Sequence, residues 1–184
     1  TDLPVFTTIE ALREDLLISE QTIRVNDLGA GSRVFGNSVR TVADMAKTAL
    51  KPADQAQMLF RLARYFDSRQ VLELGTSFGI TTLYLALGAD SGAVHTIEGC
   101  PQTFRIAQHH FDQLEQRNIT ATLGSFRSKL HETLQRMGTV DLVFIDGHHA
   151  KDPTLEYFEQ ILRFAHDGSV FVFDDIHWSR GMEQ

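Results

Sequence analysis

The chain has a single cysteine, no long apolar run and no secretory signal pattern, and each absence narrows what it can be. Cys100 is alone among 184 residues, so no intrachain disulfide can form, and a reducing compartment fits. No apolar run approaches the roughly 20 residues that a membrane-spanning helix needs. No secretory signal pattern opens the chain. We therefore expect a cytoplasmic protein without a membrane partner.

Basic residues are also scarce relative to acidic ones. The sequence has 17 Lys and Arg against 24 Asp and Glu, which gives a net charge of −7. This balance and the lack of a basic stripe disfavour a broad nucleic-acid surface, so we do not expect a nucleic-acid partner. The length allows one domain with a sizeable core, and the hydrophobic content of 42% is ordinary for a globular protein.

The most informative segment is a predicted strand that runs into a glycine turn, VLELGTSFG at residues 71–79. A second predicted strand, VHTIE at residues 94–98, ends in an acidic residue. Glycines let the backbone turn tightly and let a ligand approach it closely. Glu98 at the strand tip can accept hydrogen bonds from both hydroxyls of a ribose. Together these features predict a pocket for a nucleoside-bearing cofactor at the carboxyl edge of a parallel sheet.

The spacing of this motif, E-x-G-x-x-x-G, differs from the G-x-G-x-x-G of dinucleotide sites. It resembles the first motif of class I S-adenosylmethionine-dependent methyltransferases, and Glu98, 19 residues past Gly79, matches that family's ribose-binding acid. The resemblance implies S-adenosylmethionine as cofactor. The cofactor-binding residues that it implies are Glu73, Gly75, Thr76, Ser77, Gly79, Glu98, Ser125, Phe126 and Asp146. The alternative is another doubly wound domain whose glycines only turn the chain.

A competing glycine motif, DLGAGSR, lies at residues 27–33. No strand–helix–strand unit surrounds it, and no acid-tipped strand follows at the right distance. We interpret it as a segment that folds over the pocket as a lid and excludes water. Arg33 would then meet an anionic substrate group, with a solvated loop arginine as the alternative.

From residue 70 onward, predicted strands alternate with predicted helices. The strands are 71–74, 93–97, 119–123, 140–145 and 169–173, and helices before them are expected at 8–18, 39–50 and 52–66. This alternation predicts an α/β fold with a Rossmann-like sheet of five parallel strands and helices on both faces. Gly168 is expected to end the helix before the last strand. We expect residues 1–69 to form an N-terminal helical segment and lid, and residues 70–184 to form the cofactor-binding core.

The class I methyltransferase fold normally adds two strands after the fifth, but this chain ends about ten residues after the fifth predicted strand. We therefore expect the C-terminal strands 6 and 7 to be missing. An unprotected edge strand favours self-association. A homodimer is accordingly one expected oligomeric state.

Acidic residues gather after the fourth and fifth predicted strands, in IDGHH at residues 145–149 and FDDIHW at residues 173–178. Parallel strands deliver their carboxyl ends to one edge, so Asp146, Asp174 and Asp175 should converge beside the glycine loop. Three such carboxylates repel one another unless a cation or bound protons relieve the charge. Oxygen ligands of this type suit Mg²⁺, Mn²⁺ or Ca²⁺.

This arrangement resembles the metal-dependent O-methyltransferases of the catechol and caffeoyl-CoA kind, in which an Asp after the fourth strand and an Asp-Asn pair after the fifth hold a divalent ion. Asp146 and Asp174 match, while Asp175 stands where Asn is usual. That family's catalytic Lys position holds His149, and the D-G-x-H run is similar to relatives that act on sugar hydroxyls. The resemblance implies a metal site of Asp146, Asp174 and Asp175. It also implies His149 and Asp146 as catalytic residues, with His149 as the base.

Other interpretations of these acids stay open. Asp146 can cap the helix that follows it, and Asp174 and Asp175 can be solvated loop acids. A metal-free site, in which Asp and His serve as base machinery, is a further alternative.

Several single residues carry weaker signals. Ser125 can contact the adenine edge or simply cap its helix, and Trp178 can form a wall of the acceptor pocket or a hydrophobic anchor. His109 and His110 are expected at the surface. Two more histidines, His148 and His177, flank the proposed site and would suit a transition metal together with the carboxylates, but their spacing gives no support.

The motifs together predict an enzyme that transfers a methyl group from S-adenosylmethionine to an oxygen of a small-molecule acceptor, with a divalent metal. One alternative is a methyltransferase-like module that binds the cofactor without turnover. Another is methylation of a protein or an RNA.

Overall fold

The computed structural model describes residues 4–25, 39–178 and 181–183. The glycine motif at residues 27–33, with Arg33, lies outside the described residues. The described helices and strands are α1 (Pro4–Ile18), β1 (Thr22–Arg24), β2 (Val39–Thr41), α2 (Val42–Ala49), α3 (Ala53–Tyr65), β3 (Gln70–Leu74), α4 (Ile80–Gly88), β4 (Ala93–Glu98), α5 (Pro101–Gln113), β5 (Ile119–Leu123), α6 (Phe126–Met137), β6 (Val140–Ile145), α7 (Lys151–Leu162) and β7 (Ala165–Phe173).

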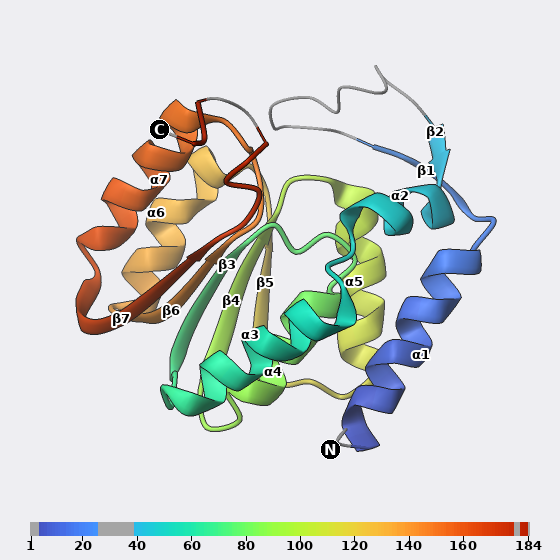
Figure 1. The fold of residues 1–184 in the computed structure, drawn as a ribbon, viewed down its shortest axis with the longest axis horizontal. Helices are drawn as coiled ribbons and strands as arrows, with labels where there is room; N and C mark the ends of the chain where they lie inside the picture. The colour runs from blue at the N-terminus through green and yellow to red at the C-terminus, as the bar shows by residue number, and fades with distance from the viewer. Residues whose placement is uncertain (1–3, 26–38, 179–180, 184) are drawn as a thin grey trace.

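The large sheet has five parallel strands in the order β5-β4-β3-β6-β7. The predicted α/β fold with five parallel strands is therefore confirmed. Helices α6 and α7 cover one face, and α3, α4 and α5 cover the other (Figure 1). The chain order reverses at β3, which lies between β4 and β6, and ligands of such sheets bind at this switch point, outside the carboxyl ends of the strands.

Both faces of the central strands are apolar because both are covered by helices. Alternate residues of a strand point to opposite faces. Leu72, Val143 and their neighbours in register pack against α6 and α7, whereas Val71 and Leu142 pack against α3 and α4. Near-continuous apolar runs are typical of parallel strands buried in this way.

The prediction that strands 6 and 7 are missing is wrong for the chain as it is described. The sixth and seventh strands in chain order, β6 and β7, both belong to the large sheet. They are the segments that the sequence analysis counted as fourth and fifth. The count differs because the short antiparallel pair β1–β2 precedes the sheet and carries no strong sequence signal.

Two local boundaries also differ from the prediction. The stretch Val39–Thr41 is a strand instead of the start of a helix, and α2 begins after it with the Thr41 hydroxyl accepting the N–H of Asp44. Gly168 does not end α7, which stops at Leu162. Gly168 instead lies inside β7, in the stretch where the register of the β6–β7 pair shifts, and its N–H donates to the ring of His166.

The N-terminal helices share a core with the rest of the chain. Phe6 and Ile9 of α1 belong to one buried cluster with Tyr84 of α4 and Phe111 of α5. The division at residues 69 and 70 stays a prediction. None of the described helices combines the length and the apolar composition needed to cross a membrane.

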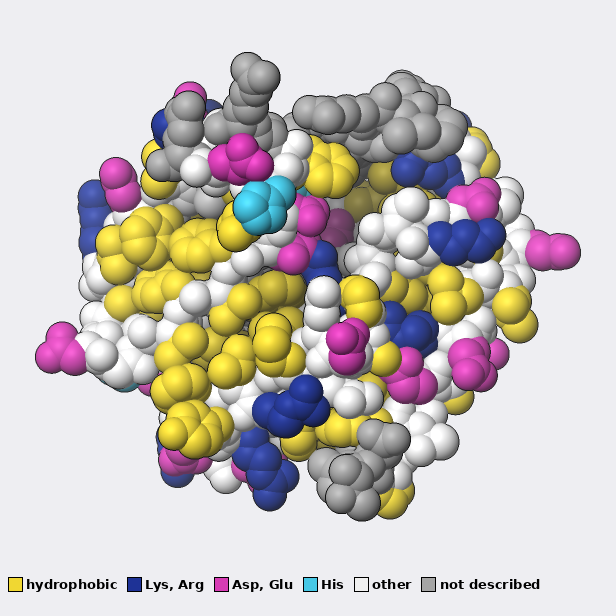
Figure 2. All heavy atoms as spheres, viewed as in Figure 1, with side chains coloured by type: hydrophobic (Ala, Val, Ile, Leu, Met, Phe, Trp, Pro, Cys, Tyr) yellow, Lys and Arg dark blue, Asp and Glu magenta, His cyan; other side chains and the backbone are white. Residues whose placement is uncertain are grey.

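Strand β7 is an edge of the large sheet, since β6 is its sheet neighbour on one side and none is recorded for the described residues on the other. The side chains of residues 170–173 are only partly buried. Figure 2 shows hydrophobic side chains gathered on the left half of this face, where Figure 1 places β7. Pairing of this edge with a second copy stays a prediction.

Candidate active site at the carboxyl edge of the sheet

The glycine loop after β3 is held between the ends of two neighbouring strands. The Gly75 N–H donates to the carbonyl of Ile97 at 3.0 Å, and the Asp146 N–H donates to the carbonyl of Leu74 at 2.9 Å. Gly75 has φ of 109°, and a Cβ there would collide with the Asp146 carbonyl. Only glycine combines this backbone conformation with so close an approach.

Gly79 turns the same loop into α4. It is the N-cap residue of that helix, with φ of 81°. A Cβ at this position would meet the ring of Phe111 on α5. The second glycine of the motif is therefore needed for the turn and for helix packing, in addition to any role in binding a ligand.

Glu98, the predicted ribose acid, already organises the loop. Its two carboxylate oxygens accept the backbone N–H of Ser77 at 2.8 Å and of Cys100 at 2.7 Å. Burial raises the pKa of Glu98, and these two hydrogen bonds oppose the rise. A carboxylate has about four acceptor positions, so the two backbone N–H groups of Ser77 and Cys100 do not by themselves fill Glu98.

Glu73 is fully buried beneath the loop. Its Oε2 accepts hydrogen bonds from the hydroxyls of Thr82 at 2.5 Å and Thr96 at 2.6 Å, while its Oε1 has no hydrogen-bond partner. Thr76 of the loop joins the network through Thr96 at 2.5 Å. Burial raises the pKa of Glu73 to about 7. An unpaired buried oxygen is costly, and it offers an acceptor to a donor brought by a ligand.

Ser125 and Phe126 lie at the same edge, where β5 leads into α6. The Ser125 hydroxyl accepts the N–H of Ser128 at 3.3 Å, so Ser125 caps α6. The Phe126 ring packs edge-on against Tyr157 at 5.7 Å between ring centres. It also lies against Gly147, where a Cβ would collide with it. Contacts of both residues to an adenine stay predictions.

The acidic residues after β6 and β7 converge as predicted, but they divide into two sets. Ligand atoms of Asp146, His149 and Asp175 lie within 4.8 Å of one another, and we call these three residues the ligand trio. The Nε2 atom of His149 is 3.6 Å from a carboxylate oxygen of Asp175. Near the upper middle of the face in Figure 2, acidic side chains and a histidine border one side of a hollow. The donor chemistry of the trio fits a divalent ion.

Asp174 belongs to the second set, with a residue that the sequence analysis missed. The ammonium of Lys51 forms ion pairs with Asp174 and, at 3.3 Å, with Asp146. Burial raises the pKa of Asp146, and this effect outweighs the opposing charges of Lys51 and His149. No motif marks Lys51, which lies between two predicted helices, 95 and 123 residues from its partners.

Backbone strain is concentrated around the two sets. Six non-glycine residues of the described chain have positive φ, and four of them are at this edge: Ser77, His148, His149 and Asp175. Such conformations cost about 1–3 kcal/mol each and cluster at functional sites. The observation supports a ligand role for the edge.

The other histidines have separate partners. His148 is 3.0 Å from the hydroxyl of Tyr157, and His177 is 3.2 Å from Glu183, so neither joins the ligand trio. His110 is buried with its Nδ1 at 2.9 Å from the carbonyl of Phe78. The prediction that His110 is a surface residue is wrong, because this carbonyl satisfies its ring on the packed side of α5. The Trp178 ring lies 5.4 Å from that of His149.

A cavity of about 460 Å³ lies between α1, β1 and α5, lined among others by Leu12, Ile23 and His109. None of the predicted site residues lines it. This cavity is therefore separate from the candidate site, which we identify from the side chains that converge at the carboxyl edge of the sheet.

A doubly wound parallel sheet with a glycine loop and an acid-tipped second strand defines a nucleoside-cofactor-binding α/β protein. Residues 72–176 match the family described as a methyltransferase domain. The match covers more than half of the chain, and the chain belongs to this family. The resemblance to class I S-adenosylmethionine-dependent methyltransferases is thereby confirmed.

Relatives agree with this assignment. A catechol O-methyltransferase from Mycobacterium tuberculosis is 31% identical over 137 residues, which are 73% of this chain and 60% of that protein. The O-methyltransferase TomG from Streptomyces achromogenes, solved in complex with SAM, has a TM-score of 0.62 and 27% identity, over 73% of this chain and 66% of that one. An O-methyltransferase from Bacillus cereus, solved in complex with SAH, has a TM-score of 0.61 and 25% identity, over 70% of this chain and 59% of that one.

The chain spans only part of these relatives. It covers 60% and 61% of the length of two catechol O-methyltransferases. The activity and the acceptor of this chain therefore do not follow from these relatives alone.

Proposed function

We propose that this chain binds S-adenosylmethionine at the carboxyl edge of its sheet and transfers the methyl group to a hydroxyl oxygen of a small molecule. The observation that carries the proposal is that the Gly75 loop, Glu98 and Asp146 lie at the carboxyl ends of three adjacent strands, β3, β4 and β6. Solved relatives in complex with SAM and SAH support the cofactor. Catechol O-methyltransferases among the relatives support an oxygen acceptor.

The cofactor contacts follow from the available polar groups. Glu98 would accept the ribose hydroxyls, and the backbone of the Gly75 loop would lie against the ribose and the methionine tail. The unpaired Oε1 of Glu73 supports a role in accepting a donor from the cofactor, directly or through a water. Ser125 and Phe126 would border the adenine.

The transfer is an in-line displacement that depends on positioning. The methyl carbon leaves the sulfonium, the sulfur keeps the electron pair of the broken bond, and the acceptor oxygen forms the new C–O bond. The hydroxyl proton goes to His149 or to Asp146. Asp175, 3.6 Å from the His149 Nε2, would stabilise the imidazolium that forms.

A divalent ion would be held by the ligand trio. Bound there, it would lower the pKa of an acceptor hydroxyl. If His149 were a ligand of the ion, its ligating nitrogen would not be available as a base, so the two roles of His149 are alternatives. In a metal-free site the His149–Asp175 pair would accept the proton.

The acceptor side would be formed by the described N-terminal helices and by Trp178. Lys51 brings the N-terminal segment to the acidic edge. The Trp178 side chain is 41% exposed beside His149 and offers a flat apolar surface to an aromatic or sugar acceptor.

Calorimetric titration of S-adenosylmethionine tests the proposal. The wild type should bind saturably, and Glu98→Gln should bind about tenfold more weakly, because a carboxylate accepts hydroxyl hydrogen bonds more strongly than an amide. Glu156→Gln is the matched control, since Glu156 pairs with Arg127 on an exposed surface of α7. Folded wild type without affinity for the cofactor, or equal affinity in both variants, would contradict the assigned pocket.

Methyl transfer to catechol and to sugar hydroxyls, with and without EDTA, then separates the chemical alternatives. Activity lost in EDTA and restored by Mg²⁺ or Mn²⁺ supports the ion at the trio. Activity that EDTA leaves unchanged favours the His149–Asp175 base. Cofactor binding without transfer to any acceptor favours a module without turnover.

A further inference from the structure

Lys51 is fixed firmly at the acidic edge although it comes from the N-terminal helices. It lies in the short connection between α2 and α3, and its side chain is 15% exposed. Its backbone carbonyl accepts a hydrogen bond of 2.6 Å from Arg13 on α1, whose Nε also binds Glu10. The lysine is therefore positioned by α1 as well as by its own connection.

The contacts of Lys51 divide the predicted metal ligands. Its ammonium pairs with Asp174 and with Asp146, whose side chains are 22% and 16% exposed. Asp146 is at the same time a member of the ligand trio, whereas Asp174 is not. The Asp146 carboxylate is thus shared between the ammonium and the place where a divalent ion would lie.

Two cations that share one carboxylate repel each other, and low exposure weakens the screening of that repulsion. An ammonium has three donors and no acceptor, so Lys51 cannot take a proton from the acceptor. Its charge can relieve the repulsion among the carboxylates, which a bound divalent ion or bound protons would otherwise relieve. Lys51 therefore competes electrostatically with that ion.

We propose that Lys51 is the internal counter-ion of the acidic edge and determines how tightly the edge binds a divalent ion. It holds Asp174 out of the ligand set and weakens binding at Asp146. This inference rests on the proposed function, because it concerns the ion that the ligand trio would hold. It assigns to Lys51, a residue of the N-terminal segment, an effect on the affinity of the acidic edge for that ion.

Calorimetric titration of Mn²⁺ tests the inference without any activity measurement. Lys51→Met removes the charge and keeps most of the side-chain volume, and we expect it to bind Mn²⁺ about tenfold or more tightly than the wild type. Lys51→Arg keeps the charge and should stay within about twofold of the wild type. Lys47→Met is the matched control, because Lys47 is 60% exposed on α2 and pairs with Asp44.

A double variant tests whether Asp174 takes part. Lys51→Met with Asp174→Asn should lose most of the gain in Mn²⁺ affinity, because the carboxylate released by the first change is absent. Lys51→Gln keeps an N–H donor for both carboxylates and serves in place of Lys51→Met if that variant does not fold. Lys51→Gln should also bind Mn²⁺ more tightly than the wild type.

The inference is overturned if removal of the Lys51 charge leaves Mn²⁺ affinity unchanged or weakens it, or if neither wild type nor variant binds Mn²⁺. Titration of S-adenosylmethionine into the same samples separates the two proposals. Cofactor binding without the Lys51 effect rejects only the counter-ion. Absence of cofactor binding rejects the proposed function, whatever Mn²⁺ does.

Discussion

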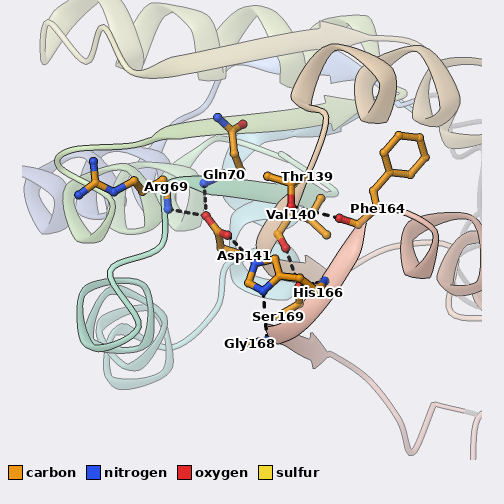
Figure 3. A network of polar contacts seen from close by, with 9 residues as sticks. All are labelled: Arg69, Gln70, Thr139, Val140, Asp141, Phe164, His166, Gly168 and Ser169. Atoms are coloured by element: carbon orange, nitrogen blue, oxygen red, sulfur yellow. Dashed lines mark hydrogen bonds and ion pairs between the residues drawn. The ribbon is translucent and has the colours of Figure 1, made fainter.

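Strand β6 has an aspartate near each end, and the two lie in opposite surroundings. At the amino end, Asp141 accepts the backbone N–H groups of Arg69 and Gln70, both at 2.7 Å, and pairs with His166 at 2.8 Å (Figure 3). Burial raises the pKa of Asp141, but these hydrogen bonds outweigh it, so the pKa is lowered overall. At the carboxyl end, burial prevails over the charges of Lys51 and His149, and the pKa of Asp146 is raised.

Backbone groups provide further hydrogen-bond partners for the network around Asp141 at the amino end of β6. The second ring nitrogen of His166 accepts the N–H of Gly168 at 3.1 Å, and the Ser169 hydroxyl donates to the Val140 carbonyl at 2.7 Å (Figure 3). Among the described residues, each end also has a buried oxygen without a hydrogen-bond partner: the Oε1 of Gln70 at the amino end and the Oε1 of Glu73 at the carboxyl end. The aspartate at the amino end therefore fastens β3, β6 and β7 together, whereas the aspartate at the carboxyl end is paired with Lys51 from the N-terminal segment.

The largest effect is expected from Gly75→Ala at the carboxyl edge. The Cβ would collide with the Asp146 carbonyl at a φ of 109°, so we expect a loss of about 3 kcal/mol or more in the free energy of unfolding. Urea denaturation measures it. Gly138→Ala is the matched control, because Gly138 also has positive φ but nothing lies within 4 Å of its Cβ. Equal losses would show that the close approach to β6 contributes nothing.

The next effect concerns pH and Glu73. Its pKa is raised from 4.5 to about 7, so the folded state binds more protons than the unfolded state between these values. The stability that this group contributes is present below about pH 4.5 and is lost as the pH rises through about 7. The loss is on the order of 3 kcal/mol.

Glu73→Gln should flatten this decline, because glutamine does not titrate. The unfolding free energies of the wild type and the variant are measured from pH 5 to pH 8. In the difference between them, the contributions of the other titrating groups cancel. Glu132→Gln on the exposed side of α6 is the control and should leave the slope unchanged. Parallel curves for wild type and Glu73→Gln would contradict the raised pKa.

The smallest effect is expected at the amino edge, from Asp141→Ala. It leaves the N–H groups of Arg69 and Gln70 without their acceptor and should cost about 2 kcal/mol, since the site is partly exposed to water. Because the pKa of Asp141 is lowered, its contribution is present above about pH 3.8 and lost as the pH falls through the folded value. The affinity for S-adenosylmethionine should not change.

Thermal and urea unfolding with a parallel cofactor titration check this separation of the two edges. Asp112→Ala, at an exposed position of α5, is the control and should cost less than about 0.5 kcal/mol. A weaker cofactor affinity in Asp141→Ala would break the comparison, because the amino edge would then act on the site.

The sequence predicted the sheet and the glycine loop at its carboxyl edge well because both depend on short local patterns. Five apolar runs, each followed by a turn or a polar residue, suffice to indicate five parallel strands. The glycine motif and Glu98 lie on consecutive strands, so their proximity follows from the fold class. The pair β1–β2 was not predicted, because three-residue strands carry too little pattern.

The acidic edge was predicted only in part. Carboxyl ends of parallel strands indicated that Asp146, Asp174 and Asp175 would converge, but not which of them would face a cation. Lys51 was missed because its ion pairs span 95 and 123 residues and follow no motif. His110 was misplaced because a carbonyl from another element, that of Phe78, makes its burial possible.

The amino-acid sequence by itself determined the order of strands and helices, the two glycines of the loop and the acids at the strand ends, since these depend on residues that are near one another in the chain. Only the tertiary structure decided the charge balance of the two edges: Lys51 holds Asp174, Glu73 keeps one oxygen unpaired, and the pKa of Asp141 is lowered while that of Asp146 is raised. The reason is physical. Burial and partner geometry set the energy of a charge, and both are known only when distant segments have packed.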